Sequence, residues 1–177
     1  MINSSNDKRK VVLGIVSAWI LSSIFLGAGW FIAYRLELFS GLPLQKILGI
    51  TFLPPALSLA IGIAWAARIR HVSQNIDGSP PELGSPLDIV LRYVQNTNEQ
   101  VTLFIVMTFC FMASTPEVSK TILPISGIWF FIARLLFWAG YSRGNLKRAV
   151  GFAATFHPTL ILLVVSLILM IRNIFAG

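Results

Sequence analysis

Five long apolar runs alternate with short polar segments along the 177 residues of the chain. The runs cover residues 11–34, about 47–67, 88–113, 121–140 and about 150–171. A helix rises about 1.5 Å per residue, so each run is long enough to cross the ~30 Å hydrocarbon core of a bilayer. The pattern therefore predicts an all-α integral membrane protein with five spans.

The first run follows a polar, basic tail at residues 1–10. Secretory signal peptides begin in a similar way, but their apolar region is only about 7–15 residues long. Residues 11–34 contain 24 residues without a charge. This length favours a retained membrane helix over a cleaved signal peptide.

Prolines and polar residues mark the expected breaks between the helices. Pro54-Pro55 interrupts the second run, where two missing backbone donors predict a kink or a late helix start. Residues 68–87 are rich in charged residues, proline and glycine, which predicts a loop. Asp88 is the expected N-cap of the third helix.

Composition supports the membrane assignment. The chain is 55% hydrophobic and 12% charged, with a mean hydropathy of +0.76, far from the values of soluble domains. A net charge of +7 is also typical of proteins that bind nucleic acids. Because the basic residues lie between the apolar runs and form no continuous patch, they indicate membrane orientation and no nucleic-acid binding.

Candidate metal ligands are few in this sequence. The single cysteine, Cys110, lies in an apolar run, so no disulfide and no cysteine-ligated metal is expected within the chain. His157 precedes Pro158 without a second ligand at a metal-binding spacing, and we interpret it as an interfacial residue at a helix start.

The distribution of Lys and Arg predicts the orientation. A cytoplasmic N-terminus places nine of these residues on the cytoplasmic side and four outside, as the positive-inside rule requires. The nine are Lys8, Arg9, Lys10, Arg68, Arg70, Arg92, Arg143, Lys147 and Arg148, and the four are Arg35, Lys46, Lys120 and Arg172. The host membrane would be the cell membrane of a bacterium or an internal membrane of a eukaryote.

An unusual polar motif opens the third run. Arg92, Asn96 and Glu99 stand at positions i, i+4 and i+7, so a helix places them on one face. This face suits a zwitterionic ligand or a partner helix with complementary charges. A carboxylate at the depth of Glu99 is costly unless it is paired, so we expect it to meet Arg92, Arg134 or a ligand amine.

Two motifs together resemble the family of membrane-associated proteins in eicosanoid and glutathione metabolism (MAPEG), which includes microsomal glutathione transferases and leukotriene C4 synthase. The first motif is Arg92-x-x-x-Asn96-x-x-Glu99. The second is the stretch Ala133-Arg134-Leu-Leu-Phe137-Trp-Ala-Gly140-Tyr141-Ser-Arg143 with Arg148 after it. Ala67-Arg68 is a weaker match to the end of the first core helix. The resemblance covers about residues 47–172.

The resemblance implies a four-helix core at residues 47–172 with the helix at 11–34 as an addition. It implies a homotrimer that binds glutathione, as co-substrate, between subunits near the cytosolic face. Asn96 and Glu99 would hold the amino end, Arg68 and Arg134 the carboxylates, and Arg92 and Arg148 would lie near the sulfur, with Tyr141 also in the site. The implied activity is glutathione transfer to a hydrophobic electrophile, or reduction of a lipid hydroperoxide.

Two positions depart from the family pattern. Phe137 stands where several active members have tyrosine, and Gln100 follows Glu99 where a tyrosine is often found. Because the family also includes members that bind lipid without catalysis, two other functions stay open. One is a non-catalytic protein that binds a lipid or a partner in the same crevice. The other is a small transporter with Glu99 and the arginines along a polar path.

Overall fold

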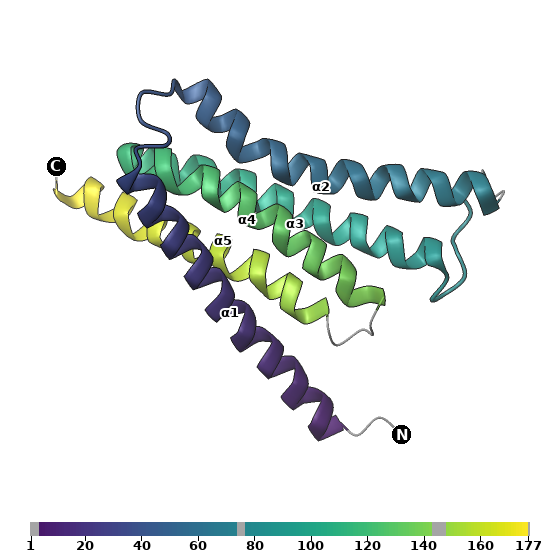
Figure 1. The fold of residues 1–177 in the computed structure, drawn as a ribbon. Helices are drawn as coiled ribbons and strands as arrows, with labels where there is room; N and C mark the ends of the chain where they lie inside the picture. The colour runs from purple at the N-terminus through teal and green to yellow at the C-terminus, as the bar shows by residue number, and fades with distance from the viewer. Residues whose placement is uncertain (1–3, 74–76, 143–147, 177) are drawn as a thin grey trace.

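The computed structural model describes residues 4–73, 77–142 and 148–176. Within these ranges the chain forms five helices, α1 (Ser4–Arg35), α2 (Leu44–Ser73), α3 (Pro86–Ser114), α4 (Pro116–Ser142) and α5 (Arg148–Ala176) (Figure 1). The predicted all-α fold is confirmed. Each helix extends beyond its apolar run, and α1 begins within the polar tail.

The prolines affect the helices in two ways, a bend consistent with the kink predicted in α2 and a very short connection between α3 and α4. α2 runs without interruption through Pro54 and Pro55, and Figure 1 shows it bending in its first half. Only Thr115 separates α3 from α4, because Pro116 suits the first position of a helix, where no backbone donor is needed. The amide of Thr115 donates to the carbonyl of Phe111 at 2.9 Å, which closes the end of α3.

The expected N-cap of α3 was wrong. The cap is Ser85, whose hydroxyl accepts a hydrogen bond from the amide of Asp88 at 3.2 Å, with Pro86 at the start of the helix. Asp88 lies one turn inside the helix, and its carboxylate accepts from the amide of Gly84 at 2.8 Å. Serine and aspartate thus satisfy helix-start donors reciprocally, as in a capping box.

Four helices are long and apolar enough to cross a membrane, namely α1 from Lys8 to Arg35, α2, α4 from Pro116 to Tyr141 and α5 from Arg148 to Phe175. The chain is therefore a multi-pass integral membrane protein. The third predicted span, α3, is not among them, since its first half carries the polar motif around Arg92 and Glu99. α3 contacts α2, α4 and α5 with one face and exposes residues such as Val106 and Phe109 on another.

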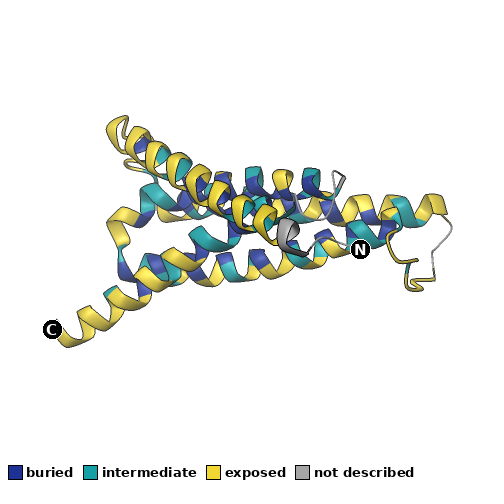
Figure 2. Cartoon of the chain, turned by 90° about the horizontal axis from the view of Figure 1, so that it is seen from below, coloured by how far each residue is buried: buried dark blue, intermediate teal, exposed yellow. Residues whose placement is uncertain are grey.

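The helices α2 to α5 run side by side with alternating direction, and α1 crosses α5 and α4 (Figure 1). Figure 2 shows α1 exposed over most of its length. It is held to the bundle by an apolar cluster in which Ala18 packs against Trp129, Ala153 and Ala154. The starts of α1, α3 and α5 and the ends of α2 and α4 therefore lie at the same end of the molecule.

Glycines permit the closest helix contacts. A Cβ atom at Gly127 of α4 would overlap the backbone of Thr51 in α2, and one at Gly151 of α5 would overlap the backbone of Phe137 in α4. A side chain at either position would force the two helices apart. By contrast, a Cβ at Gly49 of α2 would meet no atom within 4 Å.

We predict that Gly127→Ala lowers the free energy of unfolding by about 1–3 kcal/mol, the usual cost of overpacking. The matched variant Gly49→Ala should leave stability unchanged or raise it by up to about 1 kcal/mol, because alanine favours the helix. Thermal unfolding of both variants in detergent measures the difference. Equal midpoints for the two variants would contradict the α2–α4 contact described above.

Candidate functional site

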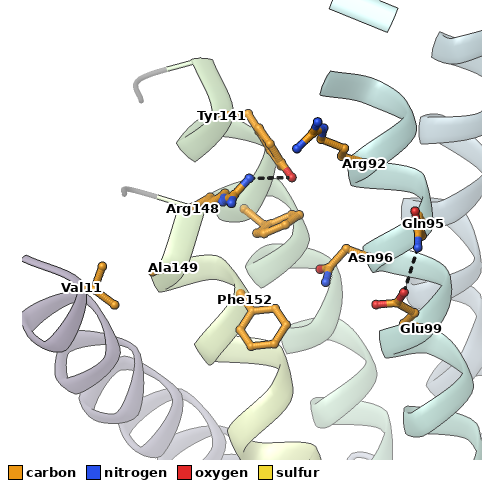
Figure 3. A pocket seen from close by; sticks show the side chains of 10 residues that line it. Val11, Arg92, Gln95, Asn96, Glu99, Tyr141, Arg148, Ala149 and Phe152 are labelled. Carbon is orange, nitrogen blue, oxygen red and sulfur yellow. Dashed lines mark hydrogen bonds between the residues drawn. The ribbon is translucent and has the colours of Figure 1, made fainter. Parts of the chain in front are cut away.

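A pocket of about 580 Å³ opens at the end of the molecule where α1, α3 and α5 begin (Figure 3). Its wall combines charged and amide side chains from α3 and a guanidinium from α5 with aromatic and apolar side chains from α1, α4 and α5. The lining residues are Val11, Arg92, Gln95, Asn96, Glu99, Phe137, Tyr141, Arg148, Ala149 and Phe152.

The polar face of α3 forms one side of this pocket. Arg92, Asn96 and Glu99 all line it, as their helical spacing predicted. Sequence reasoning missed Gln95, whose side-chain amide donates to the Glu99 carboxylate at 3.3 Å. Gln95 stands at i−4 from Glu99, so the same spacing argument would have found it. The four side chains give α3 a continuous hydrogen-bonding surface toward the pocket.

The expected pairing of Glu99 with Arg92 or Arg134 was wrong. The Nε of Arg92 lies 2.9 Å from the carboxylate of Asp88, one helical turn earlier. Glu99 is exposed and forms no ion pair among the described residues. Its carboxylate lines the pocket and, among the described residues, accepts a side-chain hydrogen bond from the Gln95 amide alone.

Arg134 lies behind the pocket wall and has no exposed surface. Its Nη1 donates to the side-chain oxygen of Asn96 at 2.9 Å. Its guanidinium carbon lies 4.2 Å from the centroid of the Phe137 ring. Its Nε and Nη2 atoms have no hydrogen-bond partner among the residues that the structure describes. Arg134 thus joins α4 to α3 and holds two side chains that do line the pocket.

Tyr141 and Arg148 close the pocket at the turn between α4 and α5. The Nη1 of Arg148 donates to the Tyr141 hydroxyl at 3.2 Å, and its guanidinium carbon lies 5.2 Å from the ring centroid (Figure 3). Both side chains are half-buried. Arg143 and Lys147, the other cations predicted in this turn, lie outside the described residues. The contact brings a guanidinium to the pocket rim in a defined position.

Arg68 is the one candidate residue that the structure does not bring to the pocket. It is exposed near the end of α2, with its guanidinium carbon 5.6 Å from the centroid of the Trp65 ring.

A second hollow of about 390 Å³ adjoins the pocket, and the two share Arg92, Tyr141 and Arg148 as lining residues. Asp88 also lines this second hollow. Arg92 and Arg148 are thus reached from two directions.

The positions that depart from the family pattern have different surroundings. Phe137 lines the pocket and packs edge-on against Tyr141, with ring centroids 5.2 Å apart. Gln100 is buried, and its side-chain oxygen accepts no hydrogen bond from the described residues.

The prediction that His157 lies at a helix start was wrong, because it is the tenth residue of α5, roughly 14 Å from the first. The part of the chain described here contains no cluster of three metal-ligating side chains.

The charges of the pocket favour an anionic ligand that also carries an amine. Two guanidiniums and one carboxylate line it, and the Arg134 guanidinium lies behind its wall. Guanidiniums attract anionic groups of a ligand, and a carboxylate attracts a cationic group. Val11 of α1 and Ala149 and Phe152 of α5 add an apolar side to the pocket.

A model of the MAPEG family matches residues 47–168, which include most of α2 through α5. The chain belongs to the MAPEG family. This confirms the resemblance carried by the two motifs, and the match leaves α1 outside it. Searches of curated proteins and of solved structures gave no significant match. Family membership places the pocket in a membrane protein of a family associated with glutathione and eicosanoid metabolism.

We predict that Asn96→Ala lowers the free energy of unfolding by about 1–3 kcal/mol, because it removes the hydrogen bond that Asn96 accepts from the fully buried Arg134 guanidinium. The matched control is Asn98→Ala, at an exposed position of the same helix. Thermal unfolding of both variants without added ligand in detergent tests this. If Asn98→Ala lowers the unfolding midpoint as much as Asn96→Ala does, the hydrogen bond between Asn96 and Arg134 contributes nothing to stability.

Proposed function

We propose that this protein is a membrane-bound, glutathione-dependent enzyme that acts on hydrophobic electrophiles or lipid hydroperoxides. One observation carries the proposal. In a chain of the MAPEG family, Arg92, Glu99 and Arg148 line the same pocket, and Arg134 is buried behind its wall. Glutathione has two carboxylates, one ammonium and one thiol. These groups complement a site with several guanidiniums and one accessible carboxylate.

In this proposal Glu99 and Asn96 hold the amino end of glutathione. The assignment of Glu99 is supported by its exposure and by the absence of an ion pair to it among the described residues. Asn96 is held in place by Arg134, which acts from behind the wall through this hydrogen bond and through its positive charge. The arginines then bind the two carboxylates and the sulfur of glutathione.

Arg148 and Arg92 are assigned to the sulfur. A free thiol has a pKa near 8.5 and is mostly protonated at neutral pH, but a neighbouring guanidinium favours the thiolate, which is the nucleophile. Tyr141 fixes the Arg148 guanidinium at the rim through its hydroxyl and its ring. Arg92 is similarly fixed by Asp88.

The chemistry follows from an activated thiolate. In conjugation, the sulfur attacks an electrophilic carbon, a C–S bond forms, and the leaving group departs with its electron pair. In peroxide reduction, the sulfur attacks the terminal oxygen, the O–O bond breaks, and the alkoxide takes a proton to become an alcohol. The sulfenic acid of glutathione then condenses with a second glutathione to give a disulfide and water. The apolar side of the pocket suits a lipid-soluble partner.

We predict that glutathione bound at neutral pH gives a thiolate absorption in the ultraviolet difference spectrum, and that Arg148→Ala abolishes it. Turnover with a reactive electrophile should fall about 10²-fold, as when one charge-stabilising donor is removed. Arg172→Ala, an exposed arginine at the other end of α5, is the matched control and should behave like the wild type.

If wild-type protein neither binds glutathione nor gives the thiolate signal, the enzymatic proposal is wrong. Lipid binding without turnover would then support a non-catalytic protein that uses the same crevice. Glu99→Gln serves as a second test, because it removes the carboxylate assigned to the ligand amine while it keeps the side-chain shape. Glutathione affinity should fall while thermal stability is maintained, since Glu99 is exposed.

We further propose a homotrimer whose four-helix core is formed by α2 to α5, with α1 as an addition and the N-terminus in the cytoplasm. The exposed position of Arg68 supports a shared site, since it lies at the same end of the molecule as the pocket but apart from it. A neighbouring subunit can supply this arginine to the ligand carboxylates. The excess of Lys and Arg at this end supports a cytoplasmic pocket.

Mixed oligomers test the shared site. Arg68→Ala and Arg148→Ala chains should each be inactive alone, and their co-expression should restore part of the activity, because some sites combine an intact Arg148 with a neighbour's intact Arg68. Both chains carry distinguishable tags, so mixed oligomers can be purified. If both residues act within one chain, mixing restores nothing.

A further inference from the structure

The polar pocket has an apolar side to which a helix outside the family match contributes. Val11 of α1 lines this side together with Ala149 and Phe152 of α5. Figure 3 shows these three residues across the pocket from Glu99 of α3. The family match covers residues 47–168, so Val11 lies outside it. One wall of the pocket is therefore specific to this chain's additional helix.

Close packing between α1 and α5 fixes the position of Val11. Three residues further along α1, a Cβ atom at Gly14 would lie 3.2 Å from the side chain of Val150. One turn beyond, Ala18 is fully buried against α4 and α5. Positions 11, 14 and 18 have the i, i+3, i+7 spacing of a single helix face. The face of α1 that packs on α5 therefore reaches the pocket at Val11, which is held in place by the contacts behind it.

The pocket is open between α1 and α3. Among the described residues, α1 packs on α4 and α5 and makes no contact with α3. Both α1 and α3 nevertheless line the pocket. Because α1 is long and apolar enough to cross a membrane, its outer surface faces lipid. A lipid-soluble molecule can therefore enter the pocket beside α1, where it meets Val11.

The two substrates of the proposed reaction need different sides of the pocket. The polar side chains of α3 are assigned to glutathione, and Arg148 of α5 is assigned to its sulfur. Arg148 directly precedes Ala149, so it stands where the polar side and the apolar side meet. A co-substrate that reacts with the sulfur must contact it. The apolar lining that α1 and α5 provide beside Arg148 consists of Val11, Ala149 and Phe152.

We infer that Val11 is a specificity-determining residue, whose side chain limits the size of the hydrophobic co-substrate beside the sulfur. Ala149 contributes only a methyl group and so leaves space there, while the branched side chain of Val11 bounds this space from the other helix. None of the three side chains can compensate a charge, so the part of the co-substrate next to its reactive atom is uncharged. The inference rests on the proposed function, because it requires a glutathione thiolate in the pocket.

Two electrophiles of different width test the inference on the full-length protein in detergent. They are chlorodinitrobenzene and chlorodinitronaphthalene, both with nitro groups ortho and para to the chlorine, and the naphthalene has one more fused ring. In both, the sulfur attacks the carbon that bears chlorine, a C–S bond forms, and chloride leaves with the electron pair of the C–Cl bond. Each kcat/KM is divided by the rate constant with free glutathione, which removes the difference in intrinsic reactivity.

Substitutions of Val11 should shift the preference between these electrophiles in opposite directions. Val11→Ala widens the apolar side and should raise the ratio of naphthalene to benzene turnover about tenfold, near the lower end of what one methylene contributes in an apolar pocket. Val11→Trp narrows this side and should lower the ratio by a similar factor. The matched control is Val12→Trp, because Val12 is 57% exposed and does not line the pocket. It should keep the wild-type ratio.

The glutathione thiolate signal separates the two proposals, since Val11 is assigned to no group of glutathione. An unchanged ratio in both Val11 variants, with this signal intact, would overturn the inference and leave the proposed function standing. A change in Val12→Trp as large as in Val11→Trp would overturn it too, because the effect would then come from the lipid-facing surface of α1. No signal in the wild type would refute the proposed function and the inference with it. If Val11→Trp does not fold, Val11→Ala alone decides.

Discussion

Burial of the Arg134 guanidinium is the constraint on which the polar end of the molecule depends. A charged side chain inside an apolar helix bundle requires compensation, and here one amide oxygen and one aromatic face supply it. Both partners, Asn96 and Phe137, line the pocket. The helix α3 can therefore not turn its polar face to lipid without leaving this cation unpaired. The polar motif of α3 and the arginine of α4 stabilise each other.

Close helix contact at glycine completes the site. Gly151 lets the start of α5 approach the backbone of Phe137 in α4. This approach sets Arg148, one turn earlier in α5, against Tyr141 at the end of α4. The position of the guanidinium at the rim is thus a consequence of backbone packing, not of the arginine side chain alone. Glycine at residue 151 is required here because any Cβ would separate the two helices.

The helix α1 contributes to two different environments. Its first turns place Val11 at the polar pocket, and its middle forms the wall of an apolar cavity with α5. The tight contact at Gly14 and Ala18 separates the two. The MAPEG match begins at residue 47, so both of these α1 surfaces lie outside the matched residues.

The sequence by itself determined the helical class, the membrane environment, the family and the common face of Arg92, Asn96 and Glu99. The class, the membrane environment and the common face follow from local periodicity and composition, which need no knowledge of neighbours in space, and the family follows from the resemblance of two motifs. Only the tertiary structure decided that Arg134 lies behind the wall, that Glu99 is unpaired and that Arg68 stands apart. It also decided that His157 lies deep beside Trp19. Ion pairs and burial depend on helix rotation and crossing, which close contacts at Gly127 and Gly151 fix and which no linear pattern encodes.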